Sequence, residues 1–418
     1  MTSLVLGIDL GTSGVRIAVL DQGHSLQYSD SIPYKLGLHR PDDWTRACST
    51  LIAGIPAEQR SNIQALAVDG TSGTLLACDL EGRVQGEALL YSEVCQGFEQ
   101  QLHQLVPEGG PASSSSGSLA RALQLTKLYG STTLLRHQAD WINGWFLGDW
   151  TWGEEGNNLR LGWNLERECW PALLTQAPWN ERLPVIRASG DQLGQISKRR
   201  AKELGLPSDA QIVAGTTDSN AAVLATDPGD DDGITVLGTT LVMKRFTTVP
   251  IRGPGITCHR VGGRWLCGGS SNAGAGVLRQ FFSDELLTEL SRQINPDTNS
   301  GLAFRPLPRP GERFPVDDPS LMPILEPRPV SDALFLQGLL EGLADIEAQG
   351  WHTLTALGAK PPKRLISIGG GARNPQWRRI RERRLGVPVI TSQQQPAAGV
   401  ARLALASLNE SRPSTEQG

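Results

Sequence analysis

A carboxylate followed by a turn rich in glycine and hydroxyl groups stands near the start of the chain, at Asp9, Gly11, Thr12, Ser13 and Gly14. Such a turn lets successive backbone N–H groups converge, and the hydroxyls add further donors, which together suit a phosphate group. A carboxylate would repel a phosphate unless a cation lay between them, so Asp9 indicates Mg²⁺, held through water. A plain hairpin turn is the alternative interpretation of the same residues.

Two further glycine turns occur in the second half of the chain. Gly238, Thr239 and Thr240 repeat the pattern without the acid, and a phosphate-binding turn in each half makes the interpretation stronger than one turn alone. Three consecutive glycines at 369–371, followed by Asn374, cost conformational entropy, so we expect the backbone there to approach a flat base or a ribose closely. The chain carries neither a P-loop nor a Rossmann fingerprint.

Two more acids stand at the ends of strand-like segments. Asp218 precedes "SNAAVLA" and is either the N-cap of a helix or a functional carboxylate at the mouth of a strand. Asp69, in "AVDGTSG", is likewise either a turn acid or part of a site. Arg16 is most simply an exposed strand arginine, although it could assist the first turn. His137 and the other histidines form no ligand-spaced cluster, and we find no GxSxG motif and no convincing Ser/His/Asp set.

The hydrophobic pattern and the turn residues predict the elements that would position these residues. A helix begins near Asp42 or Asp43, and the other segments follow in order. We expect strand–turn–strand over 4–20, 62–84 and 234–246, helices over 119–130 and 331–358, strand–turn–helix over 210–226, a strand leading into a small-residue helix over 265–282, a proline-rich segment at 306–329, and strand–glycine turn–helix–strand over 364–390.

The chain is long enough for two domains, and its pattern indicates an internal duplication. It has 418 residues, of which 39% are hydrophobic, so it can bury substantial cores. A strand pair whose turn carries glycine and hydroxyls occurs once near the start of each half. The acidic segment "DPGDDDG" separates the halves, and we place the boundary near Asp227, with domains at 1–226 and 227–418.

The net charge and the cysteine content of the chain argue against several classes of function. The formal net charge of −4 argues against a general nucleic-acid binder. The arginines after the third glycine turn are most simply the solvated face of a helix: Arg378, Arg379, Arg381, Arg383 and Arg384. No apolar run approaches the ~18 residues of a membrane span, and no signal peptide precedes the first strand. The six cysteines lack CxxC spacing, so we expect no zinc site or disulfide framework and a reducing, cytoplasmic location.

Taken in order, these segments resemble the FGGY carbohydrate kinases of the actin-like ATPase superfamily. "GIDLGTSGVRIAVLD" resembles the family's first phosphate loop, "PDDWTRA" its DPxxW segment, and "VDGTSGTLLACDLEGRV" lies where the family has its substrate-loop strand pair. "GTTDSNAA" resembles the catalytic-aspartate motif, "VLGTTLVM" the second phosphate loop, "GGSSNAGAGVLRQF" the segment beside the nucleotide and "ISIGGGARNPQW" the adenosine motif. The resemblance implies an α/β fold of two ribonuclease-H-like domains flanking a central cleft.

The resemblance also implies a role for each motif. Asp218 would take the proton from a sugar hydroxyl as it attacks the γ-phosphate of ATP, and Asp9 and Asp218 would hold Mg²⁺. Asp9, Asp69, Ser72 and Asp218 would contact the substrate. The nucleotide would be bound by Gly11, Thr12, Ser13, Gly238, Thr239, Asn272, Gly370, Gly371 and Asn374.

The sugar segment departs from the pattern of many family members. They carry a Gly-Gln-Met/Gln-His-like run where this chain has Asp69-Gly70-Thr71-Ser72-Gly73. This version, with "SSSSGSLARALQL" downstream, resembles the short cyanobacterial and plant xylulokinase-like proteins, which are D-ribulose kinases. The resemblance therefore implies an ATP-dependent kinase acting on D-ribulose. D-xylulose kinase and a non-catalytic, actin-like nucleotide switch are the alternatives, with small molecules rather than nucleic acid or membrane as partners and the oligomeric state left open.

Overall fold

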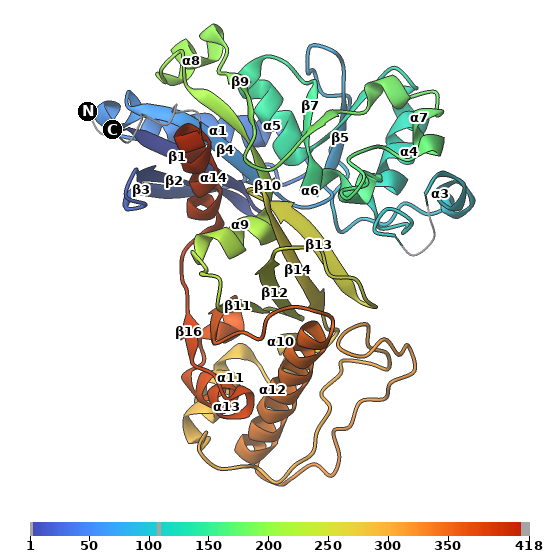
Figure 1. The fold of residues 1–418 in the computed structure, drawn as a ribbon, viewed down its shortest axis with the longest axis vertical. Coiled ribbons are helices and arrows are strands. Elements are labelled where there is room, and N and C mark those ends of the chain that lie inside the picture. Colours follow the sequence, from blue (N-terminus) through green and yellow to red (C-terminus); the bar gives the residue numbers. More distant parts are fainter. Residues whose placement is uncertain (1–2, 107–109, 411–418) are drawn as a thin grey trace, which may run out of the picture. The chain divides into compact units, whose positions relative to one another are not determined.

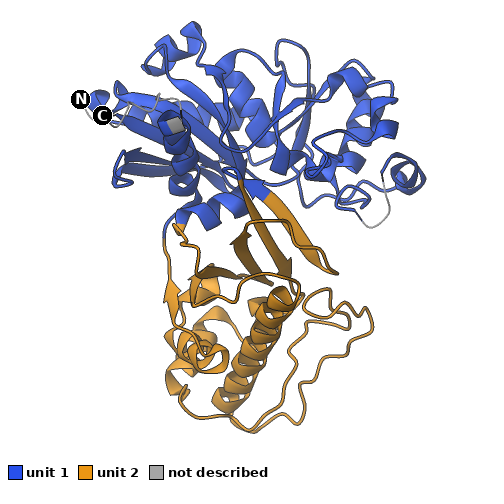
Figure 2. Cartoon of the chain, viewed as in Figure 1, with its two compact units in different colours: residues 1–225, 260–263, 394–418 blue, residues 226–259, 264–393 orange. Residues whose placement is uncertain are grey.

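The computed structural model describes residues 3–106 and 110–410, which form two compact units (Figure 2). Unit 1 comprises residues 1–225, 260–263 and 394–418, and unit 2 comprises residues 226–259 and 264–393. The expected division at 226 and 227 differs from these units mainly in two segments, because residues 260–263 and residues from 394 onward both group with unit 1. Residues from 394 onward group with unit 1, because their helix packs on the first sheet.

Unit 1 is built on a six-stranded sheet in the order β3-β2-β1-β4-β10-β9 (Figure 1). Strands β1, β4 and β10 are parallel, whereas β2 and β3 return antiparallel beside β1 and β9 lies antiparallel to β10. The strands are β1 (Leu4–Leu10), β2 (Gly14–Asp21), β3 (Leu26–Pro33), β4 (Ile63–Gly70), β9 (Gln192–Gln195) and β10 (Gln211–Thr217). The apolar runs of β1 and β4 are buried, as expected for central strands covered on both faces.

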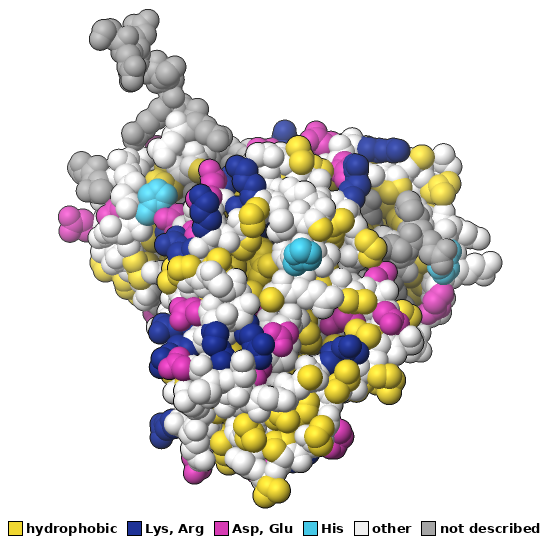
Figure 3. Space-filling model, turned by 60° about the horizontal axis from the view of Figure 1, so that its bottom comes forward, with side chains coloured by type: hydrophobic (Ala, Val, Ile, Leu, Met, Phe, Trp, Pro, Cys, Tyr) yellow, Lys and Arg dark blue, Asp and Glu magenta, His cyan; other side chains and the backbone are white. Residues whose placement is uncertain are grey.

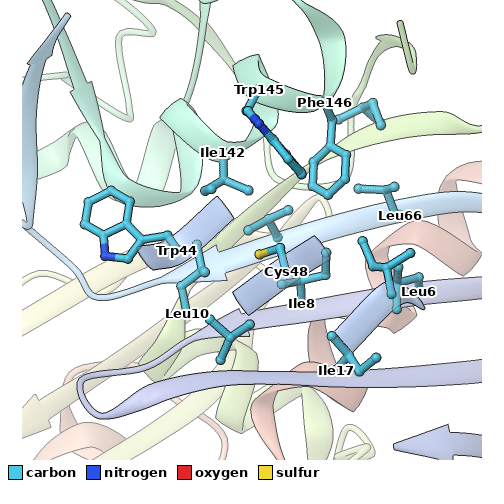
Figure 4. Packing of buried hydrophobic residues seen from close by; sticks show 14 of the residues in the cluster. Leu6, Ile8, Leu10, Ile17, Trp44, Cys48, Leu66, Ile142, Trp145 and Phe146 are labelled. Carbon is cyan, nitrogen blue, oxygen red and sulfur yellow. The ribbon is translucent and has the colours of Figure 1, made fainter. Parts of the chain in front are cut away.

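Helices cover both faces of this sheet. On one face α1 (Pro41–Gly54) and α5 (Gln138–Leu147) place Trp44, Cys48 and Ile142 against Leu6, Ile8 and Leu10 of β1 (Figure 4). The other face receives α14 (Pro396–Glu410), which packs on β1, β4 and α9 (Asp218–Ala225). Side chains alternate across a strand, so Asp9 lies on the face opposite Ile8 and Leu10.

A second, smaller core lies in unit 1 beyond the main sheet. Here β5 (Leu75–Cys78) pairs with β6 (Leu134–His137), and not with β4, against α4 (Ser118–Tyr129). The strand–turn–strand predicted over 62–84 thus consists of two strands in different sheets. The remaining elements of the unit are α2 (Ala57–Arg60), α3 (Glu99–Leu105), β7 (Trp152–Glu154), α6 (Glu155–Asn158), η1 (Leu159–Leu161), α7 (Ala172–Thr175), η2 (Asn180–Arg182), β8 (Val185–Arg187) and α8 (Lys198–Leu204).

Unit 2 repeats the same sheet plan, in the order β13-β14-β12-β11-β15-β16. Its antiparallel β11 and β12 correspond to β1 and β2, and its parallel β15 corresponds to β4. The strands are β11 (Asp232–Leu237), β12 (Leu241–Thr247), β13 (Ile256–Val261), β14 (Arg264–Ser270), β15 (Arg364–Ile368) and β16 (Val389–Thr391). The duplication expected from the sequence is therefore present in the strand order.

The core of unit 2 forms around the long helix α12, which is buried along most of its length. Its helices are α10 (Ala275–Leu278), α11 (Asp284–Gln293), α12 (Asp332–Ala356), η3 (Gly370–Arg373) and α13 (Pro375–Leu385). The sequence suggested that the arginines of α13 form the solvated face of a helix. In the structure, they are not all solvated. Arg381 is buried and pairs with Glu347 at 2.6 Å, and Arg383 and Arg384 both reach Glu341. Buried carboxylates on α12 account for this difference.

Two further observations concern the cysteines and the surface. Cys258 on β13 and Cys267 on the neighbouring strand β14 form a disulfide, which the absence of CxxC spacing did not predict.

Figure 3 shows acidic and basic side chains interspersed on the face in view. Within residues 3–106 and 110–410, no helix combines the length and apolar character needed to span a membrane.

Candidate functional site

Three carboxylates predicted from separate motifs meet at one edge of the unit 1 sheet. Asp9 of β1 lies directly beside Asp69 of β4 in the parallel register. On the other side of β4, Gly70 pairs with Thr217, which ends β10 just before Asp218. The carboxyl ends of parallel strands share an edge of the sheet, so this topology gathers residues that are far apart in sequence.

Asp9 is almost fully buried and has one cationic neighbour. Its Oδ2 accepts a hydrogen bond from Arg16 Nη1 at 3.1 Å, and the Arg16 side chain is one-third exposed. Burial raises the pKa of Asp9, while the neighbouring Asp69 carboxyl group and the charge of Arg16 act in the opposite direction. We call the sheet edge that carries Asp9, Asp69 and Asp218 the carboxylate edge. Arg16 partly neutralises the negative charge of this edge and is therefore not merely an exposed strand residue.

Asp69 is fully buried between the other two carboxylates. Burial raises its pKa well above the ordinary range, and the charges of Asp9 and Asp218 add to this. Among the described residues, no N–H or O–H group reaches either of its carboxyl oxygens. Two neighbouring buried carboxylates cannot both ionise without great cost, which is the physical cause of the raised pKa of Asp69.

Asp218 is the accessible member of the three. It is partly exposed, it opens α9, and its Oδ1 accepts the Ser219 backbone N–H at 2.7 Å. Asp218 is the first residue of α9, so it lies at the start of the helix, one residue after the expected N-cap position. Its place beside Asp69 also leaves it at the carboxylate edge, so the two interpretations are compatible.

The donor chemistry of this edge suits Mg²⁺. This ion prefers oxygen ligands and keeps several waters, so one or two carboxylates together with substrate phosphates hold it. Asp9 and Asp218 offer carboxylates, and among the described residues neither carboxyl oxygen of Asp69 has a hydrogen-bond partner. The described part of the chain contains no group of three or more Asp, Glu, His or Cys arranged to hold a metal by protein ligands alone.

The first glycine turn joins β1 to β2 and presents its hydroxyls to solvent. Gly11 N–H donates to Gly14 O at 3.0 Å, which closes the turn, and Thr12 and Ser13 are exposed. A Cβ at Gly14 would overlap the Ile32 carbonyl of β3, so only glycine fits there. We call residues 11–14 the first phosphate loop.

The second glycine turn joins β11 to β12 in unit 2. Gly238 is partly exposed and Thr239 exposed, and their carbonyls accept the Ala275 and Gly276 N–H groups at 3.0 Å, which fixes the turn against α10. Asn272 lies just before that helix, and its Nδ2 donates to Gly311 O at 3.0 Å.

Buried Glu312 supports this segment of unit 2. It accepts the Asn272 N–H at 2.7 Å and the Ser271 hydroxyl at 2.5 Å. The sequence analysis missed Glu312, which stands in the proline-rich segment without a recognisable motif.

The third glycine turn lines a cavity of about 580 Å³ in unit 2. Gly370, Gly371 and Asn374 all border it, together with Ala275 of α10, whereas Asn272, Gly238 and Thr239 do not. The other lining residues are Leu278, Arg279, Asp284, Leu287, Thr288, Ser291, Arg292, Leu336, Arg373, Pro375, Gln376 and Trp377. A mixed apolar and basic lining of this size fits a base with its sugar.

Asn374 has a structural role at this cavity. Its Oδ1 accepts the Trp377 N–H at 3.1 Å as the N-cap of α13, and its Nδ2 donates to Ser291 Oγ at 2.8 Å. Both ends of its amide are therefore engaged by the protein. The sequence analysis quoted Trp377 as the last residue of the adenosine motif without giving it a role, and it missed Ser291, whose local sequence resembles that of any helix-face residue.

We call residues 69–73, which comprise the end of β4 and the turn that leads toward β5, the sugar loop. Ser72 is partly exposed in it, whereas Asp69 and Thr71 are buried. Thr71 is held by Gln138 at the start of α5, a contact that the sequence did not indicate. The structure also brings together a set the sequence analysis did not find, in which His137 Nε2 lies 2.9 Å from Ser118 Oγ and Nδ1 lies 3.7 Å from Asp140 Oδ2. All three are buried, and a Cβ at Gly73 of the loop would lie 3.5 Å from Ser118 Oγ.

Comparisons with known proteins place these observations in a wider context. Residues 233–408 match the C-terminal domain of the FGGY family of carbohydrate kinases. A xylulose kinase from Lactococcus lactis is 25% identical over 96% of this chain and 87% of its own length. A xyloylose kinase from Brucella ovis superposes with a TM-score of 0.83 at 19% identity, covering 98% of this chain and 91% of that one. A xylulose kinase from Rhodospirillum rubrum gives a TM-score of 0.82 at 18% identity, with coverage of 98% and 91%. The two structural matches establish the two-domain α/β fold.

Proposed function

We propose that this chain is an ATP-dependent sugar kinase of the FGGY carbohydrate kinase family, whose C-terminal domain matches residues 233–408, and that it phosphorylates the terminal hydroxyl of a ketopentose, with D-ribulose as the preferred substrate. The observation that carries the proposal is the carboxylate edge of unit 1. It combines an accessible Asp218 with a buried, charge-rich Asp9 and Asp69 beside a hydroxyl-lined turn.

In this proposal Asp218 accepts the proton of the sugar hydroxyl as that oxygen attacks the γ-phosphorus of ATP. The new oxygen–phosphorus bond forms while the bond to the β-phosphate oxygen breaks, and ADP leaves. Phosphoryl transfer passes through a loose transition state, so positioning and charge neutralisation contribute more than base strength. Mg²⁺, held by Asp9 and Asp218 partly through water, would neutralise phosphate charge.

The glycine turns would hold the nucleotide. Gly11, Thr12 and Ser13 would bind phosphate oxygens in unit 1, and Gly238 and Thr239 would do so in unit 2, where Asn272 would lie beside the nucleotide. Exposed hydroxyls and backbone N–H groups of glycine turns are suited to this contact. Gly370, Gly371 and Asn374 would border the adenosine in the unit 2 cavity, with Asn374 acting through the backbone it caps.

The choice of sugar rests on the sugar loop. Its Asp-Gly-Thr-Ser-Gly sequence resembles that of the short D-ribulose kinases. Ser72 is accessible and would bind a sugar hydroxyl, whereas the burial of Asp69 favours a role in fixing Asp9 over direct contact with the sugar. D-xylulose kinase is the second candidate, because a relative that covers most of the chain is a xylulose kinase.

A panel of pentuloses, polyols and hexoses with ATP and Mg²⁺ tests the proposal, with ADP release as the measurement. We expect the highest kcat/KM for D-ribulose. Asp218→Asn should lower kcat by a factor of about 10²–10⁴, the usual loss for a missing general base, with ATP binding retained. Asp209→Asn, at an exposed loop position before β10, is the matched control and should behave as the wild type.

Three results would count against parts of this proposal. A wild-type preference for D-xylulose would favour the second candidate. Activity of Asp218→Asn within a few-fold of the wild type would leave this residue as a helix start only. A rate of ADP release that no sugar in the panel increases would reject a ketopentose as the substrate.

A further inference from the structure

The start of helix α5 is attached to the sugar loop by Gln138. Its Oε1 accepts hydrogen bonds from the Thr71 backbone N–H at 3.0 Å and from Thr71 Oγ1 at 2.8 Å. Its own backbone N–H donates to Thr74 O at 3.1 Å. Gln138 and Thr71 are buried, so water cannot replace these bonds if the side chain is removed.

The other end of the same amide points to the first phosphate loop. Gln138 Nε2 donates to the Tyr34 hydroxyl at 3.4 Å, and the Tyr34 backbone N–H donates to Ser13 O at 3.1 Å. Tyr34 directly follows β3, which runs beside the loop. Gln138 therefore links two loops that approach the carboxylate edge from different strands.

The packing around the amide leaves little freedom. A Cβ at Gly70 would lie 3.1 Å from Gln138 Oε1 and 3.2 Å from the Ala139 backbone nitrogen, so the sugar loop rests directly on the start of α5. Thr71 Oγ1 also lies 2.7 Å from Thr74 Oγ1, which ties both ends of the loop together. Ser72 stands between these fixed points, and its orientation depends on them.

We propose that Gln138 is a positioning residue that holds Ser72 ready for the sugar and couples this loop to the first phosphate loop through Tyr34. The statement about the sugar rests on the proposed function, whereas the statement about the loops does not. The side chain of Gln138 contacts Thr71 and Tyr34, and these two contacts predict two separable effects. Loss of the Thr71 contact affects sugar binding, and loss of the Tyr34 contact affects the phosphate side.

The test compares three substitutions in the full-length protein with a matched control. Gln138→Met keeps the length of the side chain and removes both polar ends. Thr71→Val removes the hydroxyl that contacts Gln138 and Thr74, and Tyr34→Phe removes the hydroxyl that accepts from Gln138. Thr133→Val is the control, because Thr133 is also a buried threonine of unit 1, donating to Cys78 O and Gln85 Oε1 away from the loops.

We expect Gln138→Met to raise KM for D-ribulose about tenfold, equivalent to about 1.4 kcal/mol, with KM for ATP within about twofold of the wild type. It should also lower kcat severalfold, because it removes the contact with Tyr34 as well. Thr71→Val should raise the same KM in the same direction. Tyr34→Phe should leave KM for the sugar within about twofold and lower kcat severalfold. Thr133→Val should change none of these parameters, which excludes a general loss of stability as the cause.

Amide hydrogen exchange in the ligand-free protein gives a readout that does not depend on the sugar. Gln138→Met should accelerate exchange at Thr71 and Ser72, and Thr133→Val should not. An unchanged KM for D-ribulose in folded Gln138→Met, or equal changes for sugar and ATP, would overturn the proposal. If the wild type phosphorylates no ketopentose, the proposed function fails, and unchanged exchange at Thr71 and Ser72 would then overturn the positioning role as well.

Discussion

At the scale of single residues, Ser72 is the part of the sugar loop that a substrate can reach. D-ribulose and D-xylulose differ only in the configuration at C3, so discrimination requires placed hydrogen bonds and not a difference in size. A site that hydrogen-bonds one hydroxyl of the sugar disfavours the epimer, because binding the epimer leaves the polar group of the site unpaired. This costs about 1–3 kcal/mol of binding free energy. Ser72→Ala should therefore lower kcat/KM for D-ribulose about tenfold, and for D-xylulose clearly less.

The measurement is kcat/KM for both ketoses on the wild type, Ser72→Ala and the control Ser61→Ala, an exposed serine before β4. Thermal unfolding of each variant checks that the fold is retained. Equal losses on the two sugars would show that Ser72 contributes to binding without distinguishing the epimers. The selectivity would then lie in other residues of unit 1.

The sequence indicated Asp9, Thr12 and Ser72 because each stands in a local pattern of acid, glycine and hydroxyl groups. It did not indicate that Asp69 is fully buried or that Gln138 holds the loop. Both depend on which strands and helices become neighbours, and that is decided by packing over long sequence separations. The burial of Arg381 against Glu347 was missed for the same reason.

At the scale of elements, the start of the β11–β15 pair in unit 2 is fixed by an ion pair. Asp232 opens β11 and Arg364 opens β15, and the two residues are partners in the parallel register. Both carboxyl oxygens of Asp232 accept from Arg364 at 2.7 Å. These hydrogen bonds lower the pKa of Asp232, although partial burial opposes them.

This geometry predicts a pH-dependent contribution to stability. A depressed pKa in the folded state means that the stabilisation is present above the unfolded pKa of about 3.9 and is lost as pH falls through the folded value. Asp232→Asn should therefore lower the free energy of unfolding by up to about 1 kcal/mol at pH 7, because Arg364 is half-exposed, and by much less near pH 3.

Urea unfolding at several pH values between 3 and 7 measures this difference. Asp231→Asn serves as the control, because Asp231 pairs with Lys363 and both side chains are exposed, so little change is expected. A destabilisation of Asp232→Asn that does not decrease toward low pH would assign the effect to packing and not to charge.

Element types were largely predictable because apolar runs and turn residues repeat clearly, as in β1, β2, β11 and β12. Pairing was less predictable. The run over 62–84 has the appearance of a hairpin, yet β5 leaves the main sheet and pairs with β6. A hairpin pattern fixes neither the partner of its second strand nor the layer in which that strand lies.

At the scale of the whole molecule, the chain of unit 2 is inserted between segments of unit 1. The last helix, α14, returns to the first sheet and packs against α9, the helix that Asp218 opens. A Cβ at Gly399 would overlap the Ala221 carbonyl oxygen of α9, and a Cβ at Gly7 of β1 would overlap the Ala397 carbonyl oxygen. Glycine at both positions allows the helix to approach this closely.

This packing predicts that a single change in α14 affects one unit selectively. Replacing glycine by alanine inside a helix usually stabilises it by about 0.5–1 kcal/mol. At Gly399 the added methyl group has no room, so Gly399→Ala should instead destabilise unit 1, by about 1–3 kcal/mol for an overpacked core. Amide exchange should accelerate in β1, β4 and β10 and stay unchanged in β11 and β15. Ala406→Ser, on the exposed side of α14, should change neither set. Equal acceleration in both units would show that they unfold as one cooperative body, and unchanged exchange in β1 would show that α14 can shift without loosening the sheet.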